Sequence, residues 1–364
     1  FFKSIEIFSI ISFDSTEHGP AIRTFSLPRI FGPILNPKLI FIAPLILATT
    51  AVFAEWKSNA AESTTDDQDR TAFIDLTKMV AARDLEGAQN QVIDAATDQG
   101  VGFTKSFLEK YFPTVELSFD TQGGSKPTSG ILVVAPLSDE SDIKNTVFTQ
   151  LSAFYQDNRT TLNAGLGYRR LAFDNTLMLG VNAFYDHEFP YDHGRTSIGF
   201  EARTTMGEIN ANKYWATTKD KVGKKGLTER ALDGYDIEAG LPLPYMNWAT
   251  VFVKHSNWDS EIASASDLRV NEVSLRARVP VLPGLEIEGG RKYNSGAVTK
   301  DESFFMIQYN LTAALSEKPK RRGWTSKNAY ELSSMEDRRY EKVRRQNLIV
   351  KQISAPGSVT VTGF

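Results

Sequence analysis

Residues 145–186 read NTVFTQLSAFYQDNRTTLNAGLGYRRLAFDNTLMLGVNAFYD, and this stretch decides the fold. In its segment 162–168, apolar and aromatic side chains occupy the even positions, while Asn163 and two glycines occupy the odd positions. Successive side chains of a β-strand point to opposite faces, so one face here is apolar and the other is small or polar. The segment 177–186 repeats this split. The stretch therefore predicts successive β-strands, each with one apolar face.

The same alternation continues along the chain and places charged residues on the polar face. In 235–241 and 285–288, aspartate and glutamate stand opposite the apolar residues. A soluble sandwich would leave that face to solvent, whereas an outer-membrane barrel turns it to the lumen and turns the apolar face to lipid. We therefore expect the following residues to face a lumen: Asn163, Arg169, Glu201, Glu238, Arg276, Glu286 and Glu288.

About twelve such segments can be counted, each near the length that a tilted strand needs to cross a bilayer. They lie near 114–121, 130–137, 146–156, 159–171, 175–187, 194–204, 207–217, 233–242, 248–256, 268–279, 284–293 and 302–312. Most even-numbered connections are short, while several odd-numbered ones are long and polar, as in the barrel pattern of short periplasmic turns and long external loops. The sequence predicts an all-β membrane protein, a closed antiparallel transmembrane β-barrel over residues 113–313.

Composition supports this fold class and excludes several functions. The chain of 364 residues is 41% hydrophobic and contains no cysteine, which excludes disulfide scaffolds, thiol catalysis and Cys-ligated zinc. A mean hydropathy of -0.27 excludes a bundle of membrane helices. The formal charge of -3 gives no indication of a nucleic-acid partner.

The N-terminal part has the form of an export signal. Residues 38–54, KLIFIAPLILATTAVFA, form an apolar run behind a lysine that ends in a small-x-small pattern. We predict a leader over 1–54 with cleavage after Ala54. The alternative is a membrane anchor or a buried core helix. Helical spacing of apolar residues at 71–110 predicts that 55–112 is a periplasmic helical segment.

A set of motif residues in the deciding stretch resembles the β-domain of inverse autotransporters, the intimin/invasin family. The match consists of Asp157, Arg159, Thr160, Asn163, Gly165, Leu166, Gly167 and Arg169, then Met178, Gly180, Asn182, Phe184 and Asp186. Further matches are IGFEART near Glu201, NANKYW at 210–215, GYDIEAGLPLP at 234–244 and FFMIQYNL at 304–311. The resemblance covers roughly residues 103–352. It implies a twelve-stranded barrel whose C-terminal linker returns through the pore to an adhesin.

The linker of that family has a counterpart in residues 330–352, YELSSMEDRRYEKVRRQNLIVKQ. The resemblance is carried by Arg339, Tyr340, Val343, Arg345, Asn347 and Ile349, and it implies a helix that passes into an extended tail. This basic segment could lie against luminal carboxylates such as those of Glu201, Glu238, Glu286 and Glu288. The alternative is a solvated basic tail or one that binds anionic lipid. Residues 314–364 are thus expected to form a linker or plug, and the eleven residues from 354 are too few for an adhesin domain, so a passenger is expected to be absent.

Candidate catalytic residues are few. His187 and His193, with Asp186 and Asp192, surround one connection at the expected outer rim, where a hydrolytic or metal site is conceivable. Aspartate and histidine residues in a connection are more commonly solvent-exposed turn residues. We predict no catalytic, cofactor-binding or metal-binding residue and no cofactor.

The predicted function is that of an outer-membrane translocator and anchor, without enzyme activity, that exports and displays a C-terminal passenger. The alternative is a passenger-free pore that its own linker plugs. Expected partners are outer-membrane lipid, the barrel-assembly machinery and periplasmic chaperones. Peptidoglycan or a second copy of the chain is the candidate partner of the N-terminal segment.

Overall fold

The structure is a computed structural model that describes residues 112–122, 125–261, 266–298, 300–316, 324–355 and 358–363. Every described residue belongs to one compact unit, Phe41–Phe364. The predicted leader, its cleavage after Ala54 and the predicted helical segment lie outside the described residues. Among the described residues, no helix is long and apolar enough to span a bilayer.

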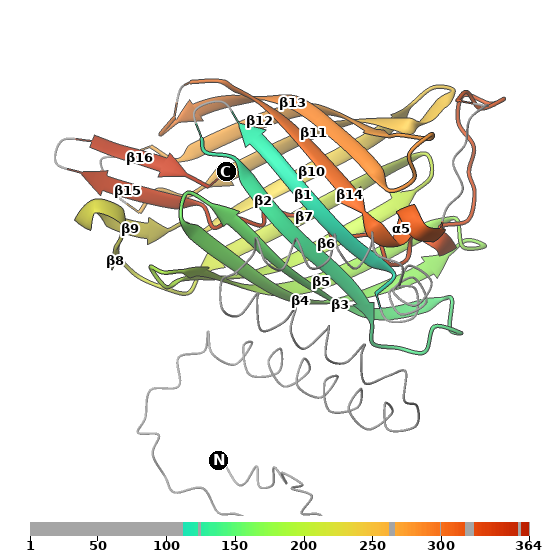
Figure 1. Ribbon diagram of the computed structural model, residues 1–364, viewed down its shortest axis with the longest axis horizontal. Helices are drawn as coiled ribbons and strands as arrows, with labels where there is room; N and C mark the ends of the chain where they lie inside the picture. Colours follow the sequence, from blue (N-terminus) through green and yellow to red (C-terminus); the bar gives the residue numbers. More distant parts are fainter. Residues whose placement is uncertain are drawn as a thin grey trace, which may run out of the picture. The chain divides into compact units, whose positions relative to one another are not determined.

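Twelve strands form a closed barrel in which every neighbouring pair is antiparallel, as the alternation predicted (Figure 1). The order around the barrel is β1-β14-β13-β12-β11-β10-β7-β6-β5-β4-β3-β2. The strands are β1 (Thr114–Gln122), β2 (Thr128–Pro136), β3 (Asn145–Gln156), β4 (Arg159–Ala172), β5 (Leu177–Phe189), β6 (His193–Thr204), β7 (Gly207–Ala216), β10 (Gly234–Leu243), β11 (Met246–Trp258), β12 (Leu268–Arg278), β13 (Leu285–Gly296) and β14 (Glu302–Asn310). Closure between β1 and β14 leaves no unpaired edge in the barrel, which is what a bilayer requires of a sheet.

The two faces of the strands differ as the sequence pattern predicted. Val181, Ile198 and Ile237 point outward and are about half exposed, as lipid-facing side chains should be. Their neighbours in the chain point inward, and Asn163 and Asn182 are buried there. Hydrophobic side chains thus cover the outside of this barrel, and polar side chains line its inside.

Inward-facing glycines make room for aromatic side chains that fill part of the lumen. A Cβ atom at Gly165 would lie 2.2 Å from a ring carbon of Phe184, and one at Gly167 would lie 2.2 Å from a ring carbon of Phe148. The two phenylalanines are buried and belong to one apolar cluster with Val343 of the C-terminal segment. The small residues of the deciding stretch therefore have a steric role inside the barrel.

A second, four-stranded sheet stands at one end of the barrel, with the order β16-β15-β9-β8 (Figure 1). Its strands are β8 (Lys221–Val222), β9 (Thr228–Ala231), β15 (Lys351–Ala355) and β16 (Ser358–Thr362). The sequence did not predict this sheet, because strands of two to five residues are too short to show an alternating pattern. β8 and β9 come from the connection between β7 and β10, whereas β15 and β16 come from the C-terminus.

The predicted helix in the linker is wrong. The described helices are α5 (Leu311–Ser316), the 3₁₀ turn η2 (Lys224–Gly226) and the 3₁₀ turn η3 (Glu336–Arg338), and residues 339–350 form no regular structure. The physical reason is that side chains of the barrel form hydrogen bonds with the backbone groups of this segment. Arg169 donates to the carbonyl oxygen of Arg339, and Asn212 donates to that of Arg344. A backbone held in this way needs no helical hydrogen bonds.

Candidate functional site: the linker seat inside the barrel

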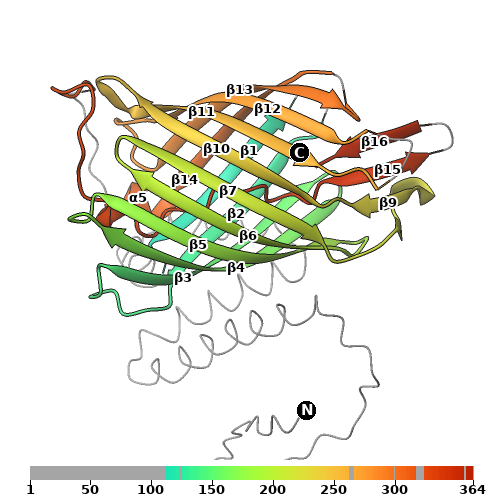
Figure 2. The same ribbon diagram turned by 180° about the vertical axis from the view of Figure 1, so that it is seen from behind.

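The C-terminal segment runs through the barrel from one end to the other (Figure 2). We call residues 335–351 the luminal linker. The Thr114 hydroxyl, at the start of β1, donates to the carbonyl oxygen of Tyr340 at 2.7 Å. Lys351, at the other extreme, pairs with Glu188 near the end of β5. Since β1 and β5 run in the same direction around an antiparallel barrel, these contacts lie at opposite ends of the lumen.

A buried charge cluster anchors the middle of the luminal linker. Both terminal nitrogens of Arg345 bond the Asp186 carboxylate, at 2.9 and 2.7 Å, and neither side chain is exposed to solvent. Arg195 binds the same carboxylate at 2.8 Å, and Asn163 donates to it at 2.8 Å. The Arg345 guanidinium also lies 4.3 Å from the ring centre of Phe184. One aspartate of the wall is therefore shared by two buried arginines, one of the wall and one of the linker.

A second arginine site holds the beginning of the luminal linker. Arg169 is bound by Glu201 at 2.6 Å, and its remaining nitrogen donates to the carbonyl oxygens of Arg339 and Glu341. Arg203 also pairs with Glu201, at 2.8 Å, and with the carboxylate of Glu341 at 3.4 Å. Glu201 therefore orients two wall arginines whose donors face the linker. It does not itself pair with a linker cation.

Further wall side chains bind the linker backbone directly. Gln150 accepts from the Val343 amide at 2.8 Å, and the Tyr214 hydroxyl accepts from the Gln346 amide at 2.8 Å. Asn163 donates to the Asn347 carbonyl at 3.0 Å. Main-chain recognition of this kind fixes the path of an extended segment because each bond defines the position of one residue.

The basic side chains of the linker meet acidic groups of the wall. Lys342 pairs with Glu116 at 2.7 Å, and Arg344 pairs with Glu238 and, at 3.4 Å, with Glu288. Arg276 binds Glu288 at 3.1 Å, so Glu288 is shared between wall and linker. Glu286, also named as a linker partner from the sequence, pairs instead with the wall arginines Arg276 and Arg278.

Apolar contacts complete the set of wall residues that bind the luminal linker, which we call the linker seat. Val343 packs with Leu132, Val134, Phe148 and Phe184, and Tyr340 packs against this cluster. Toward the exit, Ile349 and Val350 are fully buried, and Val350 joins a cluster with Tyr214 and Trp258. The predicted linker residues Tyr340, Val343, Arg345 and Ile349 thus all contact or lie within the barrel. Arg339 stays near the entrance and donates to the backbone carbonyls of Glu140 and Asp142.

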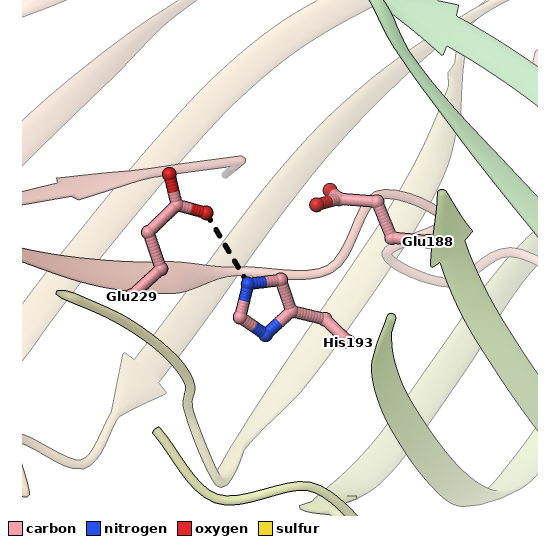
Figure 3. A group of neighbouring side chains, drawn as sticks. All are labelled: Glu188, His193 and Glu229. Atoms are coloured by element: carbon pink, nitrogen blue, oxygen red, sulfur yellow. Dashed lines mark hydrogen bonds and ion pairs between the residues drawn. The ribbon is translucent and has the colours of Figure 1, made fainter. Parts of the chain in front are cut away.

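At the exit, a compact group of charged side chains surrounds the start of β15. Glu188, His193 and Glu229 point toward one another (Figure 3), and their ligand atoms lie within 4.8 Å. The ring nitrogen Nε2 of His193 is 3.2 Å from Glu229. Arg159 binds Glu229 at 2.6 Å and Glu188 at 2.7 Å, and Lys351 also binds Glu188.

This exit cluster is balanced in charge without a metal ion. Two carboxylates face the two cations Arg159 and Lys351, so a divalent ion would have to displace one of them. Burial raises the pKa of the Glu229 carboxyl, but hydrogen bonds from His193 and Arg159 outweigh this effect and lower the pKa to about 2. The ion pairs of this cluster therefore connect β5, β9 and β15, and we call the cluster the exit latch.

The histidine and aspartate group considered from the sequence does not assemble. Asp186 faces the lumen and binds Arg345, whereas His187 and Asp192 lie 3.4 Å apart at the partly exposed turn. Among the wall residues that were missed as linker partners, Arg195 and Asp186 stand on the polar face of their strands. The alternation used to find Asn163 could therefore have found them.

The chain matches the family described as "Inverse autotransporter, beta-domain" over residues 60–347. A barrel of twelve strands that carries its own C-terminal segment through the lumen fits that description. The chain belongs to the inverse autotransporter β-domain family, and it is an integral barrel of the bacterial outer membrane. The resemblance found in the sequence is thereby confirmed.

Known relatives agree with this assignment. The chain is 24% identical to "Intimin" of Citrobacter freundii over 327 residues, which cover 87% of this chain and 34% of intimin. It is 28% identical to "Invasin" of Yersinia enterocolitica over 174 residues, 46% of this chain and 20% of invasin. The chain thus spans about a third or less of the length of these relatives.

A solved chain from the work "Unveiling the Mechanism Behind the in-meso Crystallization of Membrane Proteins" has a similar fold. The TM-score is 0.54 at 21% sequence identity, and the match covers 66% of this chain and all of that one. At this identity the likeness concerns the fold alone.

Proposed function

We propose that this protein anchors and exports a C-terminal segment across the outer membrane. The observation that carries the proposal is the path of the luminal linker. The chain leaves β14 at the end of the barrel where β1 begins, re-enters the lumen, and emerges at the opposite end as β15. The turn between β15 and β16 is the part of the C-terminal segment farthest from the entry, because β16 folds back along β15 and Gly363 accepts a hydrogen bond from Gln346 inside the barrel.

The direction of this path follows from the connections. The two longest, 217–233 and 259–267, lie at the end where β15 emerges. Outer-membrane barrels carry their longer loops on the external side and their short turns on the periplasmic side. The exit of the linker is accordingly external, and the start of β1 and the end of β14 are periplasmic.

The seat supports anchoring as well as passage. Arg345 binds the wall through a buried ion pair, and the exit latch holds Lys351 while β15 pairs with β9. A pulling force on the exported segment would have to break these contacts before it reached the membrane-embedded strands. The proposed role is that of an adhesin anchor and translocator, and it requires no catalytic group. We further propose that the cell's barrel-assembly machinery and periplasmic chaperones act on it before insertion.

The test uses the full chain with an epitope inserted after Ala355, between β15 and β16, produced in a bacterium that has an outer membrane. Antibody should label the epitope on intact cells. A matched control carries the same epitope at the turn 205–206, which joins β6 and β7 at the periplasmic end and should be labelled only after permeabilisation. Labelling of the C-terminal epitope only after permeabilisation would refute the proposed export.

A further inference from the structure

The lipid-facing surface of the barrel ends in a polar patch toward the external ends of β11, β12 and β13. Val253 of β11 and Val273 of β12 are 51% and 46% exposed and belong to the apolar band that faces acyl chains. Two and four positions nearer to the external end of β12, the outward residues are Asn271 and Arg269, and both are exposed. The apolar band therefore ends at this level, where a bilayer passes from acyl chains to headgroups.

Outward side chains of the three strands form one continuous surface, which we call the outer basic patch. Asn271 of β12 stands opposite His255 of β11 on one side and opposite Tyr293 of β13 on the other. Arg269 stands opposite Asn257 in the next outward row. Directly opposite residues of antiparallel strands have Cβ atoms about 5 Å apart, so these side chains are neighbours. The patch consists of His255, Asn257, Arg269, Asn271, Arg291 and Tyr293.

The protein neutralises the two arginines of this patch poorly. Arg269 forms no ion pair with any residue that the structure describes, and Asp267, two positions before it, accepts instead from the Ser260 amide at 2.9 Å. Arg291 is 56% exposed, and its ion pair with Asp301 is 3.5 Å long. Pairs as exposed as this one contribute little. Both guanidinium groups can therefore bind an anion from outside the protein.

Neutral hydrogen-bonding groups lie between the two arginines. Nδ1 of His255 donates to the side-chain oxygen of Asn271 at 2.8 Å, and within the described part of the chain the amide nitrogen of Asn271 has no acceptor. The Tyr293 hydroxyl has no described partner either, and the Tyr293 ring centre lies 5.6 Å from the Arg291 guanidinium. Amide and phenol groups of this kind bind the hydroxyl groups of sugars.

The other side of the barrel has no such patch at this level. On β3, β5 and β6, the outward side chains near the external ends include Tyr155, Tyr185 and Thr196, and no outward lysine or arginine stands there. Lys213 of β7 is outward, but it pairs with Asp259 at 3.9 Å. The unneutralised arginines are thus confined to β12 and β13, which indicates one local site rather than a belt around the barrel.

We infer that the outer basic patch binds the headgroup of a phosphorylated glycolipid in the external leaflet. The guanidinium groups of Arg269 and Arg291 bind phosphate, for which their planar set of donors is suited. The sugar hydroxyls bond Asn271 and Tyr293, and the acyl chains lie along Val253 and Val273.

The spacing of the two arginines fits a headgroup larger than one phosphate. Arg291 stands opposite Val273, four residues from Arg269 along β12. In paired extended strands this offset separates the Cα atoms of the two arginines by about 14 Å. A sugar headgroup with a phosphate at each end can span that distance. The site goes beyond the proposed export, but its assignment to the external leaflet rests on the orientation given with that proposal.

The experiment is native mass spectrometry of the purified full chain in detergent, titrated with lipid A, a glycolipid that carries two phosphates. The wild-type protein should form an adduct with one lipid. Arg269→Gln and Arg291→Gln should each weaken binding about fivefold, and the double variant about thirtyfold. Lipid A without its phosphates should bind the wild type and the double variant alike. Phosphatidylglycerol, which has a phosphate but no sugar, should bind the wild type more weakly than lipid A does.

Arg170→Gln is the matched control. Arg170 is also an exposed outward arginine, but it lies near the periplasmic end of β4, away from the patch. Its substitution removes the same charge and should leave the affinity for lipid A unchanged. A gel shift on boiling checks that each variant forms a closed barrel.

Wild-type affinity in the double variant would overturn the inference. So would equal binding of lipid A with and without phosphates, equal binding of phosphatidylglycerol, or a loss in Arg170→Gln as large as in the patch variants. The measurement involves no transport, so the inference can fail while the epitope test supports export. An epitope labelled only after permeabilisation would overturn the assignment to the external leaflet but not the binding.

Discussion

The Asp186 carboxylate should contribute more to linker seating than any other single side chain of the barrel wall. In an Asp186→Asn variant, Arg345 and Arg195 both remain buried without their shared ion-pair partner. Removing one partner of a buried ion pair costs about 3–5 kcal/mol, because the other charge is left uncompensated. Each 1.4 kcal/mol is a factor of ten, so the unseated state of the linker should become about a hundredfold or more populated.

The partner variant Arg345→Met should weaken the binding of the luminal linker less than Asp186→Asn does. Arg195 still neutralises Asp186, so the loss is confined to the charge-assisted hydrogen bonds of Arg345, about 1.5–3 kcal/mol. Asp220→Asn is a matched control, since Asp220 is 58% exposed and its ion pair with Arg230 is 3.4 Å long. Exposed pairs of this kind contribute at most about 1 kcal/mol.

The assay is the rate of trypsin cleavage within the luminal linker of the folded barrel in detergent. When opening and reclosing are faster than cleavage, the rate reports the population of unseated linker. We expect the order Asp186→Asn, then Arg345→Met, then Asp220→Asn and wild type, which cleave alike. If Arg345→Met is cleaved as fast as Asp186→Asn or faster, the argument from the shared carboxylate is refuted.

Three further predictions concern the latch, the glycines and the outer face. Because the pKa of Glu229 is lowered from 4.5 to about 2, its ionised form stabilises the latch above pH 4.5, and this contribution declines as the pH falls from 4.5 to 2. The hydrogen-exchange protection factors of β15, corrected for the intrinsic exchange rate at each pH, should stay high at pH 5 and fall only below about pH 4. Gly165→Ala should lower the unfolding midpoint through a clash with Phe184 worth about 1–3 kcal/mol, whereas Gly289→Ala, whose Cβ would lie 3.7 Å from its nearest neighbour, should not. Val181→Lys, on the lipid face, should cost up to about 2–4 kcal/mol, measured by urea unfolding in lipid vesicles, and an unchanged midpoint would contradict the assigned face.

Strand number and facing could be predicted from the sequence because both depend on a local rule. Residues two apart share a face, so the placement of Asn163 inside and Val181 outside follows from counting positions. The antiparallel order followed as well, since short connections join neighbouring strands. The same rule, applied to 193–201, would have placed Arg195 in the lumen, on the same face of the strand as Glu201.

The external sheet and the linker conformation could not be predicted in this way. β9 is four residues long and gains its partner, β15, from a segment 120 positions later in the chain. The helix expected around Tyr340 does not form because its hydrogen-bonding groups are used by Arg169, Gln150 and other wall residues. Both outcomes depend on contacts between distant segments, which no local pattern contains.

By itself, the sequence determined a closed antiparallel barrel with an apolar outside, because the pleat of a strand turns alternation directly into two faces. It also marked the basic segment that meets the barrel's acidic interior. Only the tertiary structure decided which carboxylate each cation binds. Arg345 binds Asp186, and Lys342 binds Glu116. The physical reason is that a cation of the linker is attracted to every carboxylate of the lumen, so opposite charge alone does not decide which residues pair. The choice is fixed by where the linker enters, which wall it follows and how the glycines, aromatic rings and backbone hydrogen bonds set its height in the lumen.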